Sequence, residues 1–353
     1  MGRRLRNAAC QRICGNALAG VLVVLLSALP FLEGVAGDAE LDENLLEQAL
    51  RRAGELERSH SMLVARDGRI LADRVYRGPD TSEPVNIKSL SKTVLAALVG
   101  AAIHQGVIAG EQQAVTELLG DGVPDAADPR VQTISVSHLL SMQSGLERTS
   151  GANYGAWVAS NDWVADALMR PFVDEPGGRM LYSTGNSHIL SAALTRASGR
   201  STLELARAWL GEPLNIRIPS WPTDPQGIYF GGNDMRLSPR ALVRIGELYR
   251  LDGMIDGRRV LPPGWVESSW TPRGRSPFNH NQYGYGWFIT ELNGERAYYG
   301  WGFGGQMLYV LPDLEMTVVI TSDPQPPSSG SRYLRQLDAL VAEFLVPAAR
   351  RGE

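Results

Sequence analysis

The chain has 353 residues, of which 44% are hydrophobic and 20% are charged, and its formal net charge is −4. Such a length and composition are ordinary for a folded protein with one large or two medium domains and argue against a largely disordered chain.

The first 37 residues have the order of a secretory signal peptide. Four arginines precede an apolar stretch over residues 17–32, and small residues follow up to Gly37. We therefore expect an exported protein, periplasmic or extracellular, whose leader is cleaved. An uncleaved membrane anchor is the alternative, although the apolar run is shorter than the roughly 20 residues of a spanning helix. The adjacent Arg3 and Arg4 leave the general and the twin-arginine export routes both open.

Both cysteines, Cys10 and Cys14, lie in this leader. The mature chain therefore has neither a disulfide nor a cysteine-ligated metal. Its five histidines are scattered and form no HExxH pair, so we expect no metal and no cofactor. No basic cluster remains once the leader is removed, which makes nucleic acid an unfavourable partner.

The pattern after the leader begins with a helix and two strands. Residues 41–58 carry apolar side chains at the spacing of an amphipathic helix. Residues 61–66 and 69–76 are typical of strands, and Asp67-Gly68 between them favours a tight hairpin.

The middle of the chain is mostly helical by pattern, and strands return near its end. Helices are expected over residues 92–105, 136–142, 157–169, 187–197, 202–210 and 239–249. Strands are expected over residues 283–290, 306–310 and 316–322, before a last helix over 331–345. This order predicts an α/β (α+β) fold: a sheet subdomain from residues 38–88 plus 274–353, with a helical subdomain, 89–273, inserted into it.

Lys88 and Lys92 are the only lysines among 34 basic residues. Arginine stays protonated in proteins, whereas a desolvated lysine can act as a base. Ser89 stands three residues before Lys92 at the start of an apolar helix, which brings the two side chains together on one face. This Ser-x-x-Lys arrangement is typical of acyl-transfer enzymes. We interpret Lys88 as a solvated charge.

Two further segments offer candidate functional groups. LYSTGN, residues 181–186, places Tyr182 just before a helix, where it could relay a proton or simply be a half-buried ring. The glycines of residues 298–313 directly precede a strand, where a backbone N–H could hold an oxyanion or the glycines could form a turn into the core.

Several segments, in this order, resemble the class C β-lactamase-like serine hydrolases, and several look closest to its nylon-oligomer (6-aminohexanoate-dimer) hydrolase and carboxylesterase side. The segments are VARDGRILADRVYRG, NIKSLSKTVLAALVG, TISVSHLLSMQSGL, DEPGGRMLYSTGNSHIL, GGNDMRLSPRALVRIGELY and GFGGQMLYVLPDLEMTVVITS. The resemblance covers nearly the whole mature chain. It implies an antiparallel sheet flanked by helices, as in β-lactamases and D,D-peptidases.

The resemblance also implies roles for single residues. Ser89 would be the acylated nucleophile, Lys92 its base or the group that keeps it deprotonated, and Tyr182 the proton relay. The N–H groups of Ser89 and Phe303 would form the oxyanion hole.

The chain departs from the β-lactam-cleaving pattern at two places. Thr184 stands where Tyr-x-Asn members carry asparagine, with Asn186 two residues on, and Gly300-Trp301-Gly302 replaces Lys-Thr-Gly. These positions are candidates for the substrate pocket. Without that lysine a substrate carboxylate loses its partner, and Arg273 and Arg275 are the candidates for a replacement charge.

The sequence therefore predicts an exported serine hydrolase that acts on a small ester or amide. One alternative is a β-lactamase or D,D-peptidase acting on peptidoglycan-type substrates. Another is a catalytically silent relative that binds a ligand, although such a protein has no need of Ser89, Lys92 and Tyr182 together. A membrane is expected as a partner only through an uncleaved leader.

Overall fold

An eight-stranded antiparallel sheet forms the centre of the fold in the computed structural model, which describes residues 40–325 and 330–351. The predicted signal peptide, residues 1–37, lies outside the described residues. The strand order is β2-β1-β12-β11-β10-β9-β8-β7. The strands are β1 (Ser59–Arg66), β2 (Arg69–Val75), β7 (Gly274–Arg275), β8 (Gln282–Tyr283), β9 (Phe288–Leu292), β10 (Glu295–Gly302), β11 (Gln306–Leu311) and β12 (Met316–Ser322).

The central strands are buried on both faces, and alternate side chains enter two different cores. In β1, Met62 and Val64 pack into one core, whereas Leu63 and Ala65 pack into the other. This follows from the two-residue period of a strand. The hairpin between β1 and β2 forms as predicted, with Asp67 and Gly68 both at positive φ.

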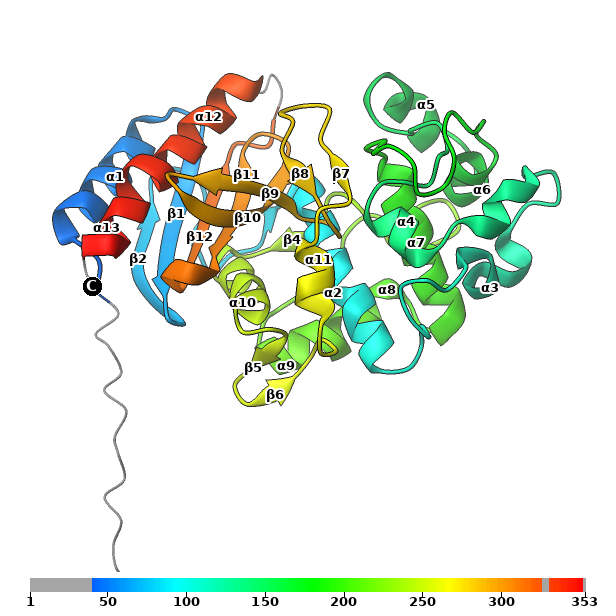
Figure 1. Cartoon of the computed structure of the whole chain (residues 1–353), viewed down its shortest axis with the longest axis horizontal. Helices are drawn as coiled ribbons and strands as arrows, with labels where there is room; N and C mark the ends of the chain where they lie inside the picture. Colours follow the sequence, from blue (N-terminus) through cyan, green and yellow to red (C-terminus); the bar gives the residue numbers. More distant parts are fainter. Residues whose placement is uncertain (1–39, 326–329, 352–353) are drawn as a thin grey trace, which may run out of the picture. The chain divides into compact units, whose positions relative to one another are not determined.

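The first and the last of the described helices pack together on one face of the sheet. Helix α1 (Glu43–Glu55) packs there beside α12 (Gly330–Leu340), which continues through η7 (Val341–Leu345) into α13 (Val346–Arg351), as Figure 1 shows. Their apolar residues cover the core that contains Met62 and Val64.

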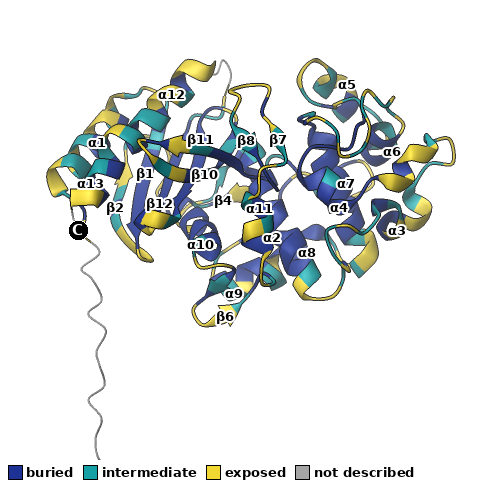
Figure 2. Ribbon diagram, viewed as in Figure 1, coloured by how far each residue is buried: buried dark blue, intermediate teal, exposed yellow. Residues whose placement is uncertain are grey.

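The other face of the sheet is covered by α10 (Pro239–Arg250) and by α2 (Ser91–His104). Every residue of α2 from Ser91 to Ala102 is buried (Figure 2), so this part of the helix lies inside the fold with no face exposed to solvent. It packs against α7 (Thr184–Ser198).

Shorter elements complete the region between β2 and β7. They are η1 (Lys88–Leu90), α3 (Val115–Leu119), η2 (Gly120–Gly122), η3 (Pro129–Thr133), α4 (Val136–Leu140), η4 (Gly151–Asn153), α5 (Tyr154–Val158), α6 (Trp163–Leu168), α8 (Thr202–Ala206), η5 (Arg207–Gly211), α9 (Glu212–Leu214), α11 (Trp265–Trp270) and the turn η6 (Pro312–Leu314) in the later β11–β12 connection. Two small ribbons pair β3 (Val85–Asn86) with β4 (Arg236–Leu237) and β5 (Met254–Ile255) with β6 (Arg258–Arg259). The subdomain boundaries drawn between residues 88 and 89 and between 273 and 274 stay predictions.

The structure differs from the predicted elements at three places. The single helix over 157–169 is wrong, because Asp162 caps a new helix, α6, by accepting from Ala165 N at 2.9 Å. The strand over 283–290 is interrupted between β8 and β9, where Gly286 adopts a positive φ. Strand β10 was not predicted, because its glycines and aromatic residues do not alternate in polarity.

None of the helices in residues 40–325 and 330–351 is long and apolar enough to cross a membrane. The same residues contain no group of three or more His, Cys, Asp or Glu side chains positioned to hold a metal ion.

Candidate active site

Ser89 and Lys92 lie together at the start of the buried helix α2. Ser89 belongs to η1, the turn directly before the helix, and its neighbours Ile87 and Leu90 are fully buried, which anchors the turn. Lys92 Nζ lies 3.2 Å from Ser89 Oγ. The predicted proximity of the two side chains is therefore present in the structure.

The Lys92 ammonium is held in a buried polar environment. Its Nζ lies 2.6 Å from the carbonyl oxygen of Gly232 and 3.3 Å from Thr184 Oγ1. Burial lowers the pKa of Lys92 to about 7, and the negative charge of Asp234 acts in the opposite direction. A lysine with such a pKa is partly neutral near neutral pH and can accept a proton.

Tyr182 lies beside the same two groups. Its ring is buried, and its centroid is 5.0 Å from Lys92 Nζ. Burial raises the pKa of Tyr182 to about 12, with the Ser89 hydroxyl acting in the opposite direction. Tyr182 is therefore a neutral phenol at physiological pH, and its hydroxyl can donate one hydrogen bond while it accepts another.

These groups open into a pocket of about 630 Å³. The pocket combines the nucleophile candidate, two charged side chains and an aromatic wall; its lining is Lys88, Ser89, Ser150, Gly151, Tyr154, Tyr182, Thr184, Asn233, Asp234, Phe278, Trp301, Phe303, Pro324 and Gln325. Phe278 packs edge-on against Tyr182 and Trp301, with ring centroids 5.5 and 5.9 Å apart.

Strand β10 presents Trp301 to the pocket and its two glycines to the protein. A Cβ at Gly300 would lie 2.5 Å from Thr93 Oγ1 and would overlap Leu90. A Cβ at Gly302 would overlap the Ile87 carbonyl. The absence of side chains thus lets β10 lie directly on η1 and α2. Gly300 and Gly302, predicted as pocket residues, are not part of its lining, because alternate residues of a strand face opposite sides.

Phe303 follows the end of β10 and lines the pocket together with Ser89. Its side chain is 42% exposed. The two residues predicted to supply the oxyanion hole are thereby brought to one pocket.

Thr184 and Asn186 take different positions at the start of α7. Thr184 lines the pocket, and its hydroxyl lies 3.0 Å from Ser150 Oγ. Asn186 is buried, and its Oδ1 accepts from Ser144 Oγ at 3.1 Å. Asn186 is absent from the pocket lining. The prediction that it is a pocket residue compensating for Thr184 therefore finds no support, because two residues along a helix rotate the side chain to another face.

Lys88 is not a freely solvated charge. It lines the pocket, and its Nζ forms an ion pair with Asp234 Oδ1 at 2.9 Å, with both side chains 23% exposed. Asn86 Nδ2 donates to the same oxygen at 2.7 Å. The arginines considered as replacement charges do not line the pocket, and the Arg273 guanidinium lies 4.1 Å from the centre of the Tyr285 ring.

Among the pocket residues that sequence reasoning missed are Ser150, Tyr154, Asn233, Asp234 and Phe278. The first two and Phe278 come from loops or loop ends with no local signal. Asn233 and Asp234 follow a double glycine, and that combination of flexible backbone and polar side chains is a signal that could have been used.

Comparison with known proteins places the chain in a family. A sequence model of the family described as Beta-lactamase matches residues 46–343. The chain belongs to the beta-lactamase family. As a member it is a class C β-lactamase-like serine hydrolase, which confirms the family predicted from the motifs.

The individual proteins that this chain resembles are distant from it in sequence. The 6-aminohexanoate-dimer hydrolase of Paenarthrobacter ureafaciens is 26% identical over 292 residues, which cover 75% of this chain and 73% of that protein. The solved structure of EstCE1, a hydrolase with promiscuous acyltransferase activity, covers 85% of this chain and 98% of its own, with a TM-score of 0.68 and 18% identity. A D-stereospecific amidohydrolase from Streptomyces sp. covers 86% and 99%, with a TM-score of 0.66 and 18% identity. These structures confirm the predicted fold.

Proposed function

We propose that this beta-lactamase-family protein is an exported hydrolase that cleaves small neutral esters or amides through an acyl-enzyme on Ser89. The observation that carries the proposal is the buried Lys92 Nζ, 3.2 Å from Ser89 Oγ. A serine hydroxyl is a weak nucleophile until a base takes its proton, and a desolvated lysine is such a base.

In the proposed reaction, neutral Lys92 accepts the Ser89 proton while Ser89 Oγ bonds to the substrate carbonyl carbon. The N–H groups of Ser89 and Phe303 hold the negative oxygen that develops. Collapse of this intermediate expels an alcohol or amine, which receives its proton through Tyr182. Water then hydrolyses the ester on Ser89 and restores the enzyme.

A fluorophosphonate probe tests the nucleophile. Intact-mass analysis is expected to show one adduct on the wild type and none on Ser89→Ala, with heat-denatured wild type as the control for non-specific labelling. An adduct that persists on folded Ser89→Ala would reject the assignment.

The aromatic wall supports the preference for neutral substrates. Phe278 and Phe303 are 48% and 42% exposed, and with Trp301 they offer apolar surface to an acyl group. The nearest cation in the lining, Lys88, is already paired with Asp234. A substrate carboxylate would have to displace Asp234 to use it, whereas a neutral ester would not.

A β-lactamase or D,D-peptidase remains the second candidate, and the presence of Lys88 in the pocket wall is the observation that favours it. The comparison of kcat/KM for a short p-nitrophenyl ester with that for a chromogenic cephalosporin decides between the two. We expect the ester to be preferred by about tenfold to a hundredfold, the cost of an unpaired substrate carboxylate. A preference for the cephalosporin that is lost in Lys88→Met would establish the second candidate instead.

A further inference from the structure

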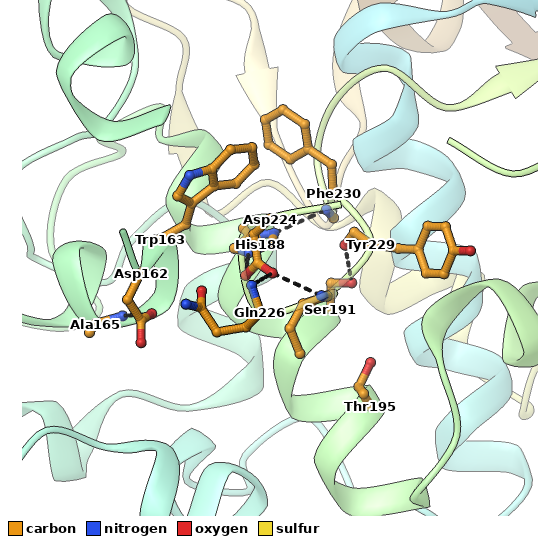
Figure 3. Close-up of polar contacts among 12 residues, drawn as sticks. Asp162, Trp163, Ala165, His188, Ser191, Thr195, Asp224, Gln226, Tyr229 and Phe230 are labelled. Atoms are coloured by element: carbon orange, nitrogen blue, oxygen red, sulfur yellow. Dashed lines mark hydrogen bonds and ion pairs between the residues drawn. The ribbon is translucent and has the colours of Figure 1, made fainter. Parts of the chain in front are cut away.

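A histidine and an aspartate are buried together behind the candidate active site. His188, on α7, and Asp224, on the loop before β4, each have a fully buried side chain, and His188 Nε2 lies 2.9 Å from Asp224 Oδ2 (Figure 3). The imidazole is surrounded by the rings of Trp157, Trp163 and Phe230, with centroids 5.9, 5.3 and 5.8 Å away. No step of the proposed reaction uses this pair.

The partners of the pair determine which nitrogen of His188 carries the proton. Asp224 Oδ1 accepts from the backbone N–H groups of Gln226 and Ile228, at 2.9 and 2.8 Å, which fixes the carboxylate. Its Oδ2 then needs a donor, so His188 Nε2 carries hydrogen. His188 Nδ1 is left as an acceptor and receives the N–H of Gly231 at 3.4 Å.

Gly231 is followed by the residue that holds the candidate base. The Gly232 carbonyl lies 2.6 Å from Lys92 Nζ. Both glycines are pressed against α7, since a Cβ at Gly231 would lie 2.7 Å from Ser191 Cβ and one at Gly232 would lie 2.7 Å from Ser187 Cβ. The Gly231–Gly232 backbone therefore contacts His188 through the N–H of Gly231 and Lys92 through the carbonyl of Gly232.

The direction of this carbonyl matters for a neutral lysine. An amine donates two hydrogen bonds and accepts one. If Gly232 O and Thr184 Oγ1 take the two donated bonds, the lone pair of Lys92 is directed at the third neighbour, the Ser89 hydroxyl. A displaced Gly232 carbonyl would leave the amine free to rotate away from Ser89.

From this chain of contacts we propose that His188 is a positioning residue for Lys92, and that Asp224 sets the tautomer with which His188 holds the Gly231–Gly232 backbone. The proposal rests on Lys92 being the base in the proposed function. Neither His188 nor Asp224 contacts substrate.

Three substitutions distinguish a positioning role of His188 and Asp224 from a role in core packing alone. In Asp224→Asn the amide oxygen still accepts from the two backbone N–H groups, so the amide NH2 points at His188. His188 Nε2 must then accept this bond, and the ring hydrogen moves to Nδ1, where it faces the N–H of Gly231 and can no longer accept from it. In His188→Gln the amide reaches the position of Nε2 and keeps Asp224 but leaves Gly231 without an acceptor. In His188→Asn the amide oxygen takes the position of Nδ1 and keeps Gly231 but loses Asp224.

The readout is the second-order rate of Ser89 labelling by a fluorophosphonate, measured with the Tm of each variant. We expect Asp224→Asn and His188→Gln to be slower by on the order of 10- to 100-fold, while His188→Asn stays within about threefold of the wild type despite a lower Tm. Tyr309→Phe, which removes a partly buried hydrogen bond to Asp338, is the control for lost stability alone.

Rates that follow Tm across all variants, or that stay at the wild-type value in Asp224→Asn, would overturn the proposal. If His188→Gln does not fold, the comparison of Asp224→Asn, which keeps the shape of the side chain, with His188→Asn still tests the proposal. A wild type that is not labelled on Ser89 would instead reject the proposed function, so the two failures are distinct.

Discussion

At the scale of single residues, the environment of Lys92 accounts for a lysine in a chain that otherwise uses arginine. Lys92 is 3% exposed and is surrounded by a carbonyl and two hydroxyls, and the carboxylate that acts on its pKa, Asp234, is paired with Lys88. Burial of a cation with so little compensating charge favours its neutral form. Arginine would remain charged in the same place.

Lys92→Arg is therefore expected to be nearly as damaging as Lys92→Ala. The positive charge survives, but the capacity to accept the Ser89 proton does not, and a loss on the order of a thousandfold in kcat is expected for a member of a catalytic unit. Steady-state kinetics on a p-nitrophenyl ester measures it. An arginine variant that keeps much of the wild-type turnover would reduce Lys92 to an electrostatic support.

The same residue predicts the pH dependence of the reaction. Because burial lowers the pKa of Lys92 to about 7, the lysine is protonated and inactive as a base below that pH and neutral above it. We expect kcat/KM to rise with pH through about 7, with no opposing limb from Tyr182, whose pKa burial raises to about 12. A profile that falls as pH increases through neutrality would contradict Lys92 as the base.

At the scale of elements, the contact between β10 and η1 holds the two sides of the pocket together. The strand reaches the backbone before Ser89 only because Gly302 has no side chain, since a Cβ there would overlap the carbonyl oxygen of Ile87. The same strand carries Trp301 into the pocket and leads to Phe303. A substitution at position 302 is therefore expected to disturb both the proposed nucleophile, Ser89, and the proposed oxyanion-hole residue Phe303.

Gly302→Ala is expected to lower the free energy of unfolding by about 1–3 kcal/mol, the usual cost of overpacking, and to reduce kcat at temperatures where the variant is folded. Urea denaturation and ester hydrolysis measure the two effects. Gly110→Ala, at a position where an added Cβ meets nothing within 4 Å, is the matched control. Equal behaviour of the two variants would show that the contact does not constrain the site.

At the scale of the whole molecule, export remains a proposal that depends on residues 1–37. We expect the mature protein to begin near Ala36 to Asp38, since basic, apolar and small residues follow one another in the order of a cleaved leader. N-terminal sequencing of protein from the periplasm or medium measures this. A full-length product confined to the cytosol would count against export.

The sequence by itself predicted those features that depend only on residues close together along the chain. The Asp67-Gly68 hairpin, the buried helix α2 and the proximity of Ser89 to Lys92 all follow from spacing over a few residues. The family and its fold followed from several such local motifs in a fixed order.

Only the tertiary structure decided which distant groups complete the site. The carbonyl that holds Lys92 comes from Gly232, 140 residues further along the chain, and Asp234, which pairs with Lys88, lies 146 residues beyond it. The orientation of Gly300 away from the pocket and of Trp301 into it depended on which face of β10 met α2. Local periodicity cannot predict these contacts, because they result from the packing of elements whose pairing is determined by the whole core.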